Sequence, residues 1–233
     1  MNKKIEKYEI LISISLIIIY ILSNSYALNN YGITSYKTTI INFILTSLII
    51  IFIIKNKLLD YYRLTSFPKP PKFLYFIPLI LLVSINLFNG FNINNTTKEI
   101  IFYIISMLLV GFIEEIIFRG FLFKMLERDN IKTAIIITTL TFGIGHIINL
   151  LNGQALIPTL LQICYAISTG YLFAIIIIKS NSLWPCIITH SLVNALSIFN
   201  VEGIVSTYVS PILLTIIPIV YSRYLNKIID FKK

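Results

Sequence analysis

The chain has 233 residues, of which 57% are hydrophobic and only 12% are charged, and its formal net charge at pH 7 is +9. Its mean hydropathy of +0.86 excludes an ordinary soluble domain. Apolar runs long enough to cross a hydrocarbon core of about 30 Å recur along the whole length, so we expect a single membrane domain over residues 1–233. The basic residues lie between these runs and not on one soluble face, which excludes nucleic acid as the expected partner.

Eight apolar segments, taken in chain order, predict an all-α, polytopic membrane helical bundle of about eight transmembrane helices. The expected spans are Tyr8–Ala27, Thr38–Ile54, Phe73–Phe88, Glu99–Phe123, Thr133–Leu151, Ile157–Ile178, Leu183–Phe199 and Ile204–Tyr221. The third span is short and contains Pro78, so a thinned, kinked or partly inserted helix is an alternative there. The first span also fits a cleavable signal peptide, and we expect its removal to leave the function unchanged.

Basic residues between the spans predict the orientation, because cytoplasmic loops carry an excess of Lys and Arg. If the chain alternates from a cytoplasmic N-terminus, the cytoplasmic side receives Lys3, Lys4, Lys7, Lys55, Lys57, Arg63, Lys69, Lys72, Lys124, Arg128, Lys132, Lys179, Arg223, Lys227, Lys232 and Lys233. The other side receives only Lys37 and Lys98. We therefore expect a multi-pass protein of the cell membrane whose N-terminus and C-terminus are both cytoplasmic.

Acidic side chains, basic side chains and histidines are few within the spans, away from the span edges. They are Glu114, Glu115, Arg119, His146 and His190. Placing a charged side chain at mid-bilayer costs roughly 2.5 to 3.5 kcal/mol of insertion free energy, so these groups must be paired with one another or have a function. At about 1.5 Å per residue from the cytoplasmic end of each span, Glu114 and His190 lie about 15 Å deep, and His146 and Asn194 about 21 Å deep. Three helices thus place polar groups in one layer, which predicts a single site.

The fourth span carries both glutamates. Glu115 and Arg119 are four residues apart and face the same way, with the acid first, as a favourable ion pair requires. Glu114 points about 100° away from them. We expect Glu115 and Arg119 to form a buried strut and Glu114 to face a cavity as an acid/base group. The alternative is that both glutamates share Arg119.

The fifth and seventh spans carry the two histidines. His146 follows Gly143 and Gly145, small residues that would let a neighbouring backbone come close. Alone, this histidine also fits an interhelical hydrogen bond. His190 and Asn194 are four residues apart on one face, and Asn194 can donate two hydrogen bonds. This pair fits an oxyanion site or a simple link between helices.

Together these residues resemble the three signatures of the CPBP family, the Abi or type II CAAX prenyl endopeptidase-like intramembrane proteases. The motif EExxxR occurs as Glu114, Glu115 and Arg119, FxxxH as Phe142 and His146, and HxxxN as His190 and Asn194. The motifs follow the family's order, each on one span, and the resemblance covers roughly residues 99–200. It implies a CAAX-protease-like catalytic core over residues 99–200 and a cavity open toward the cytoplasm or the inner leaflet.

The resemblance also implies an activity and roles for the site residues. The expected activity is that of a hydrolase, an intramembrane endopeptidase acting on a membrane-embedded or lipophilic peptide or protein. Glu114, assisted by His146, would activate water, and His190 and Asn194 would stabilise the oxyanion. Bacterial relatives are associated with bacteriocin immunity, peptide-signal maturation and surface-protein display. A small peptide or a membrane-embedded precursor is therefore the expected substrate class.

A metal site is an alternative for activating the water, and the family's naming as protease or metalloprotease leaves it open. Glu114, His146 and His190 would supply three zinc ligands with an open position for water. Against this, the HExxH motif is absent, and no carboxylate is evident to orient either histidine, because Glu115 is assigned to Arg119. We expect metal-independent hydrolysis, and no cofactor is firmly predicted.

Two other functions fit parts of the pattern. A non-catalytic membrane immunity or peptide-binding protein of the same fold need not keep all three motifs together. A proton-coupled transporter would use the Glu and His residues as a relay, but the sequence shows no internal repeat. Cys186, one turn before His190, also permits a thiol nucleophile or a metal ligand.

Overall fold

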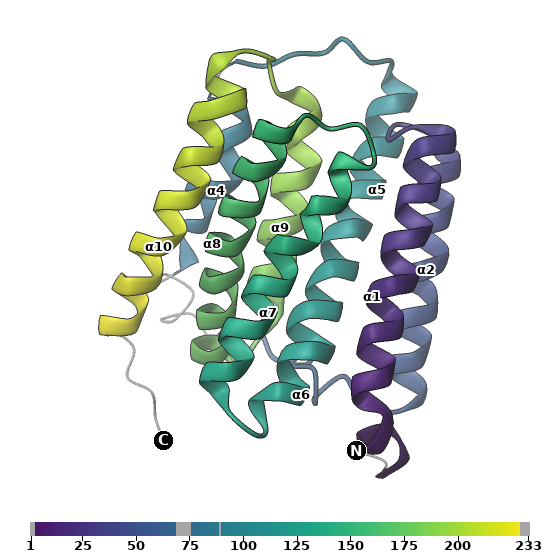
Figure 1. The fold of residues 1–233 in the computed structure, drawn as a ribbon, viewed down its shortest axis with the longest axis vertical. Helices are drawn as coiled ribbons and strands as arrows, with labels where there is room; N and C mark the ends of the chain where they lie inside the picture. The colour runs from purple at the N-terminus through teal and green to yellow at the C-terminus, as the bar shows by residue number, and fades with distance from the viewer. Residues whose placement is uncertain (1–2, 69–75, 89, 229–233) are drawn as a thin grey trace.

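The computed structural model describes residues 3–68, 76–88 and 90–228, and over these residues the chain forms helices and no β-strand. The helices are α1 (Lys3–Tyr31), α2 (Tyr36–Lys55), α4 (Leu79–Ser84), α5 (Thr97–Glu115), α6 (Phe123–Glu127), α7 (Ile131–Gly145), α8 (Leu156–Ser180), α9 (Trp184–Leu196) and α10 (Ser210–Ile228). They lie side by side along the long axis of the molecule (Figure 1). The predicted all-α bundle is confirmed.

Within the described residues, six helical segments are long and apolar enough to cross a membrane. They are Lys7–Tyr31, Tyr36–Lys55, Thr97–Glu127, Ile131–Leu150, Leu156–Ser180 and Val205–Lys227. Many large apolar side chains on α1, α2 and α10 are exposed, as expected for helix faces that contact lipid. The chain is therefore a multi-pass membrane protein.

Two of the expected spans are shorter than these six. The third, Phe73–Phe88, contains α4 and the 3-10 helix Ile85–Leu87, and its residues 73–75 lie outside the described part of the chain. Pro78 is the N-cap of α4, and a proline has no backbone N–H to continue a helix on its N-terminal side. The seventh, Leu183–Phe199, contains the apolar helical segment Trp184–Phe199, which is shorter than a full crossing. Over residues 76–88, the described helices of the third segment are too short to cross a membrane, which fits the alternative of a partly inserted helix.

The two ends of the bundle differ in charge. The start of α1 and the turn between α6 and α7 lie at one end, together with the ends of α8 and α10 (bottom of Figure 1). The turn between α1 and α2 and the start of α5 lie at the other end. We call the first the basic end, because it carries Lys124, Arg128 and Lys179, and the second the opposite end, where Lys37 and Lys98 lie. This segregation is the one expected for a basic end in the cytoplasm.

A close approach of α5 and α9 brings the site together, and Gly111 on α5 makes it possible. A Cβ atom at Gly111 would lie 2.6 Å from the Cα and 2.7 Å from the backbone nitrogen of Ser191. The Ser191 hydroxyl donates a hydrogen bond across the same contact to the Leu108 carbonyl, at 3.0 Å. The neighbouring residue His190 is thereby held against α5.

We predict that Gly111→Ala destabilises the protein by about 1 to 3 kcal/mol, because the added methyl group meets backbone that cannot move aside. Gly145→Ala is the matched control, since a Cβ atom there meets nothing within 4 Å. Thermal unfolding of the purified variants in detergent measures both. Equal melting temperatures for Gly111→Ala and the unmodified chain would show that α5 and α9 are not in this contact.

Candidate active site

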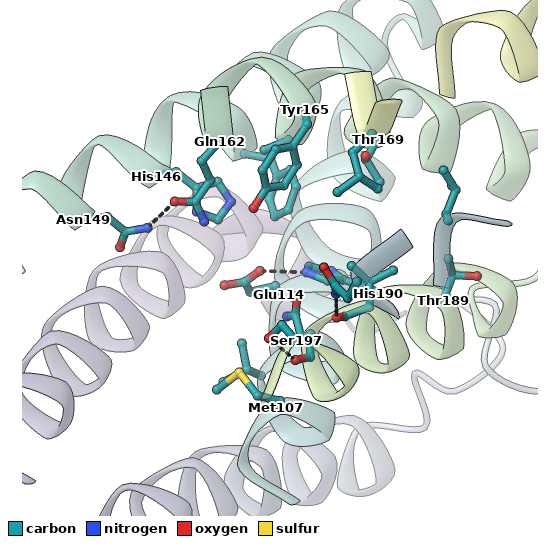
Figure 2. A pocket seen from close by; sticks show the side chains of 18 of the residues that line it. Met107, Glu114, His146, Asn149, Gln162, Tyr165, Thr169, Thr189, His190 and Ser197 are labelled. Atoms are coloured by element: carbon teal, nitrogen blue, oxygen red, sulfur yellow. Dashed lines mark hydrogen bonds and ion pairs between the residues drawn. The ribbon is translucent and has the colours of Figure 1, made fainter. Parts of the chain in front are cut away.

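A cavity of about 310 Å³ lies inside the bundle and is lined by α1, α5, α7, α8 and α9, with contributions from α4, α10 and their neighbours. All four residues expected to be catalytic line it, namely Glu114, His146, His190 and Asn194. Figure 2 shows Glu114 and His190 turned toward one another across it. Glu115 and Arg119 lie outside the lining and are 0% and 1% exposed. The structure therefore separates the two glutamates as the helix geometry predicted.

The buried carboxylate of Glu115 has two partners. Its Oε1 atom accepts a hydrogen bond from Arg119 Nη1 at 3.0 Å and lies 2.8 Å from His190 Nδ1. A carboxylate paired with a guanidinium accepts hydrogen bonds, so Nδ1 of His190 carries the proton in this contact. The other ring nitrogen, Nε2, then faces Glu114 Oε2 at 3.4 Å. Glu115 thus keeps a proton on Nδ1 and fixes the direction of the His190 ring.

The contact between Glu115 and His190 corrects two expectations. Glu115 was expected to bind Arg119 alone, and neither histidine was expected to have a carboxylate that orients it. One carboxylate oxygen has two lone pairs and can accept from both partners. Contact with His190 also requires α9 to lie close to α5, which the spacing of motifs along the chain does not show. The hydrogen bond spans 75 residues of sequence.

Phe142, the first residue of the FxxxH motif, joins the three parts of the site. The Arg119 guanidinium carbon lies 4.1 Å from the centre of its ring, a cation–π contact. The ring also meets His146 and His190 edge-on, at centroid distances of 5.3 and 5.7 Å. Gly170 leaves room for the guanidinium, because a Cβ atom there would lie 2.8 Å from Arg119 Nη2.

The two glycines before His146 differ in their surroundings. A Cβ atom at Gly143 would lie 2.3 Å from Ile167 Cγ1 and 3.1 Å from the Ile163 carbonyl, so the predicted close approach of a neighbouring helix, α8, is confirmed there. The same expectation is wrong for Gly145, which has no neighbour within 4 Å. Two residues along a helix turn the side-chain direction by about 200°, so the two positions face opposite ways.

The segment after Glu115 departs from the expected α-helix. Residues Ile116–Leu122 form a π-helix that contains Arg119, and the Phe123 N–H reaches the Phe118 carbonyl five residues back. π-Helical turns are rare and occur frequently at functional sites. All residues of this turn are buried, so packing in the bundle and not local propensity determines it.

Tyr20 is a site residue that the sequence did not reveal. Its hydroxyl donates a hydrogen bond of 2.5 Å to Glu114 Oε1, and the residue is 8% exposed. The protein has 14 tyrosines, and nothing in the apolar first span distinguishes this one. The expectation that loss of the first span leaves the function unchanged does not agree with this geometry, because Glu114 would lose a hydrogen-bond partner.

Two alternatives, a metal site and a thiol nucleophile, have less support in the geometry. Among the described residues, no group of three His, Cys, Asp or Glu side chains is arranged to hold a metal ion. The Cys186 thiol is 0% exposed and donates to the Phe173 carbonyl at 3.5 Å. It therefore does not reach the cavity.

The cavity extends from Glu114 toward the opposite end of the bundle. Its lining residues on α1 continue from Tyr20 to Leu28 and to Ile33 in the turn before α2. The resemblance implied a cavity open toward the cytoplasm, whereas the charge distribution assigns the basic end to the cytoplasm. These two expectations cannot both hold for this structure.

Fold and site together define a polytopic membrane protein with an acid, two histidines and an amide around an internal cavity. The sequence model of the family described as Type II CAAX prenyl endopeptidase Rce1-like matches residues 96–196. The match includes all three motifs and confirms the resemblance of this part of the chain to the CPBP, or CAAX-protease-like, family. Among curated proteins and solved structures there is no match. Tyr20 lies outside the matched residues.

We predict that Arg119→Leu lowers stability by about 3 to 5 kcal/mol, because it leaves the Glu115 carboxylate buried without its guanidinium. Glu114→Gln is the matched comparison on the same helix. Its melting temperature should be close to that of the unmodified protein, because an amide oxygen still accepts a hydrogen bond from Tyr20. Thermal melting in detergent measures the difference. An equal loss of stability in the two variants would mean that Glu114 belongs to the buried ion pair with Glu115 and Arg119.

Proposed function

We propose that the chain is an intramembrane endopeptidase that hydrolyses a peptide bond of a membrane-associated peptide or protein. The observation that supports this most is the separation of the two glutamates. Glu114 faces the cavity beside His190, while Glu115 is held below it by Arg119. The match of residues 96–196 to the model of a protease family supports the same reaction class.

In the proposed reaction, Glu114 accepts a proton from a water molecule that it holds together with His146. The resulting hydroxide adds to the carbonyl carbon of the peptide bond. His190, protonated on both ring nitrogens, donates a hydrogen bond through Nε2–H to the oxygen that becomes negatively charged, and the Asn194 amide donates a second one. Glu114 then returns the proton to the leaving nitrogen as the C–N bond breaks, which gives a carboxylic acid and an amine.

Tyr20 is proposed to hold Glu114 in place for this proton transfer. Its hydrogen bond occupies Oε1, so that Oε2 remains directed toward His190 and the cavity. Neutral donors to a charged acceptor contribute about 1.5 to 3 kcal/mol, and each 1.4 kcal/mol corresponds to a factor of ten in rate.

We predict that Tyr20→Phe lowers kcat by roughly 10- to 100-fold with little change in KM. The matched control is Tyr26→Phe on the same helix, because the Tyr26 side chain is exposed and its hydroxyl contacts Tyr31 instead of the site. Steady-state kinetics on both variants measure the effect. Equal kcat values for the two variants would remove Tyr20 from the reaction.

The proposed activity is tested by mapping new peptide termini. Membranes that contain the unmodified chain are compared with membranes that contain Glu114→Gln, and mass spectrometry identifies peptide ends present only in the first. We expect a defined set of new termini that Glu114→Gln and His190→Ala both abolish. The same set should persist after chelator washing.

Identical peptide termini with the unmodified chain, Glu114→Gln and His190→Ala would contradict hydrolysis. That result would favour a non-catalytic peptide-binding protein of the same fold. A stoichiometric metal ion whose removal ends cleavage, and whose return restores it, would contradict Glu114 as the base. Glu114, His146 and His190 would then be reassigned as metal ligands.

A further inference from the structure

The cavity is closed at one end, which we call its floor, and open at the other. The order of the lining residues along each helix shows which end of the bundle the opening faces. Helix α1 starts at the basic end, and its first lining residue is Tyr20, beside Glu114. The following lining residues are Asn24 and Leu28, and then Ile33 in the turn to α2. Tyr20 is 8% exposed and Ile33 is 41% exposed, so the cavity becomes more accessible toward the opposite end.

Helices α5 and α9 run in opposite directions, and the lining residues of both place the closed end of the cavity at Glu114 and His190. Helix α5 runs toward the basic end, and its lining residues begin at Tyr103 and end at Glu114. Helix α9 runs away from the basic end, and its lining residues begin at Thr189, beside His190, and end beyond the helix at Ser197. The layer that contains Glu114 and His190 is therefore the floor.

Toward the basic end, buried side chains lie beneath Glu114 and His190. The ion pair of Glu115 and Arg119 lies there, and Cys186, one turn before His190, is 0% exposed. A second, apolar cavity of about 240 Å³ lies between α1, α2 and the π-helical turn, and among the described residues only Tyr20 lines both cavities. A substrate entering from the basic end would have to displace Tyr20 or the buried ion pair.

The charge of the two ends assigns each to a side of the membrane. Short loops rich in Lys and Arg remain in the cytoplasm, and the sequence places nearly all its basic loop residues at the basic end. At the opposite end, Lys37 and Lys98 are balanced by Glu99 and Glu202. The open side of the cavity therefore faces away from the cytoplasm.

The wall between floor and opening carries uncharged polar groups. Side-chain amides contribute from Asn24, Asn86, Asn149, Gln162 and Asn194, and among the described lining residues there is no Lys or Arg. Amides both donate and accept hydrogen bonds, as the backbone of an extended peptide requires, whereas a terminal carboxylate is recognised best by a cation. The wall thus suits an internal, uncharged stretch of polypeptide.

We propose that this cavity receives its ligand from the extracytoplasmic side of the membrane, as an extended and uncharged stretch of polypeptide. That this ligand is also a substrate rests on the proposed function. The side of access does not, because it follows from the direction of the cavity and the charge of the two ends.

Reporter cysteines test the side of access without any turnover. In a Cys164→Ser background, one cysteine is introduced at a time: Asn149→Cys in the cavity wall, Glu202→Cys at the opposite end and Asp129→Cys at the basic end. Intact cells and permeabilised cells are treated with a charged, membrane-impermeant methanethiosulfonate. The parent without a reporter gives the background, since Cys186 is buried.

We expect Asn149→Cys and Glu202→Cys to react in intact cells, and Asp129→Cys to react only after permeabilisation. Reaction of Asp129→Cys in intact cells would overturn the proposal by inverting the topology. Reaction of Asn149→Cys only after permeabilisation, or in neither preparation, would overturn it by closing the outer opening. A catalytically inactive peptide-binding protein would give the expected labelling but no new termini, so the two proposals fail separately.

Discussion

The ion pair between Glu115 and Arg119 has no exposed side-chain surface, and the arrangement of the site follows from it. An unpaired charge at mid-bilayer costs roughly 2.5 to 3.5 kcal/mol, so neither group is tolerated alone. Once paired, Glu115 also holds Nδ1 of His190, and the ring then directs Nε2 toward Glu114. Glu114 is left with Tyr20 and the cavity as its surroundings, which suits a group that exchanges protons.

Several neighbouring residues make this pair possible and are explained by it. Phe142 covers the guanidinium with its ring, and Gly170 leaves the space that the guanidinium fills. Gly111 lets α9 approach α5, and without that approach His190 would not reach Glu115. The same buried pair lies on one side of the cavity, so it supports both the proposed chemistry and the proposed direction from which a ligand enters.

Much of this could be predicted from the sequence because it depends on local spacing. The separation of Glu114 from Glu115 follows from the helical repeat, and the common layer of Glu114, His146 and His190 follows from counting residues along each span. The contacts that the sequence did not reveal depend on how helices meet: the Glu115–His190 hydrogen bond and the Tyr20–Glu114 hydrogen bond. The π-helical turn at Ile116–Leu122 likewise arises from packing and leaves no periodic signal.

The central claim is that Glu114 acts on a water molecule and does not itself attack the peptide. A single turnover with enzyme in excess, in water labelled with a heavy oxygen isotope, tests this on a peptide found by terminus mapping. We predict that the new carboxyl group of the first product carries the label, because the attacking oxygen comes from solvent. An unlabelled first product, with the label appearing in the Glu114 side chain, would show attack by the carboxylate and contradict the account.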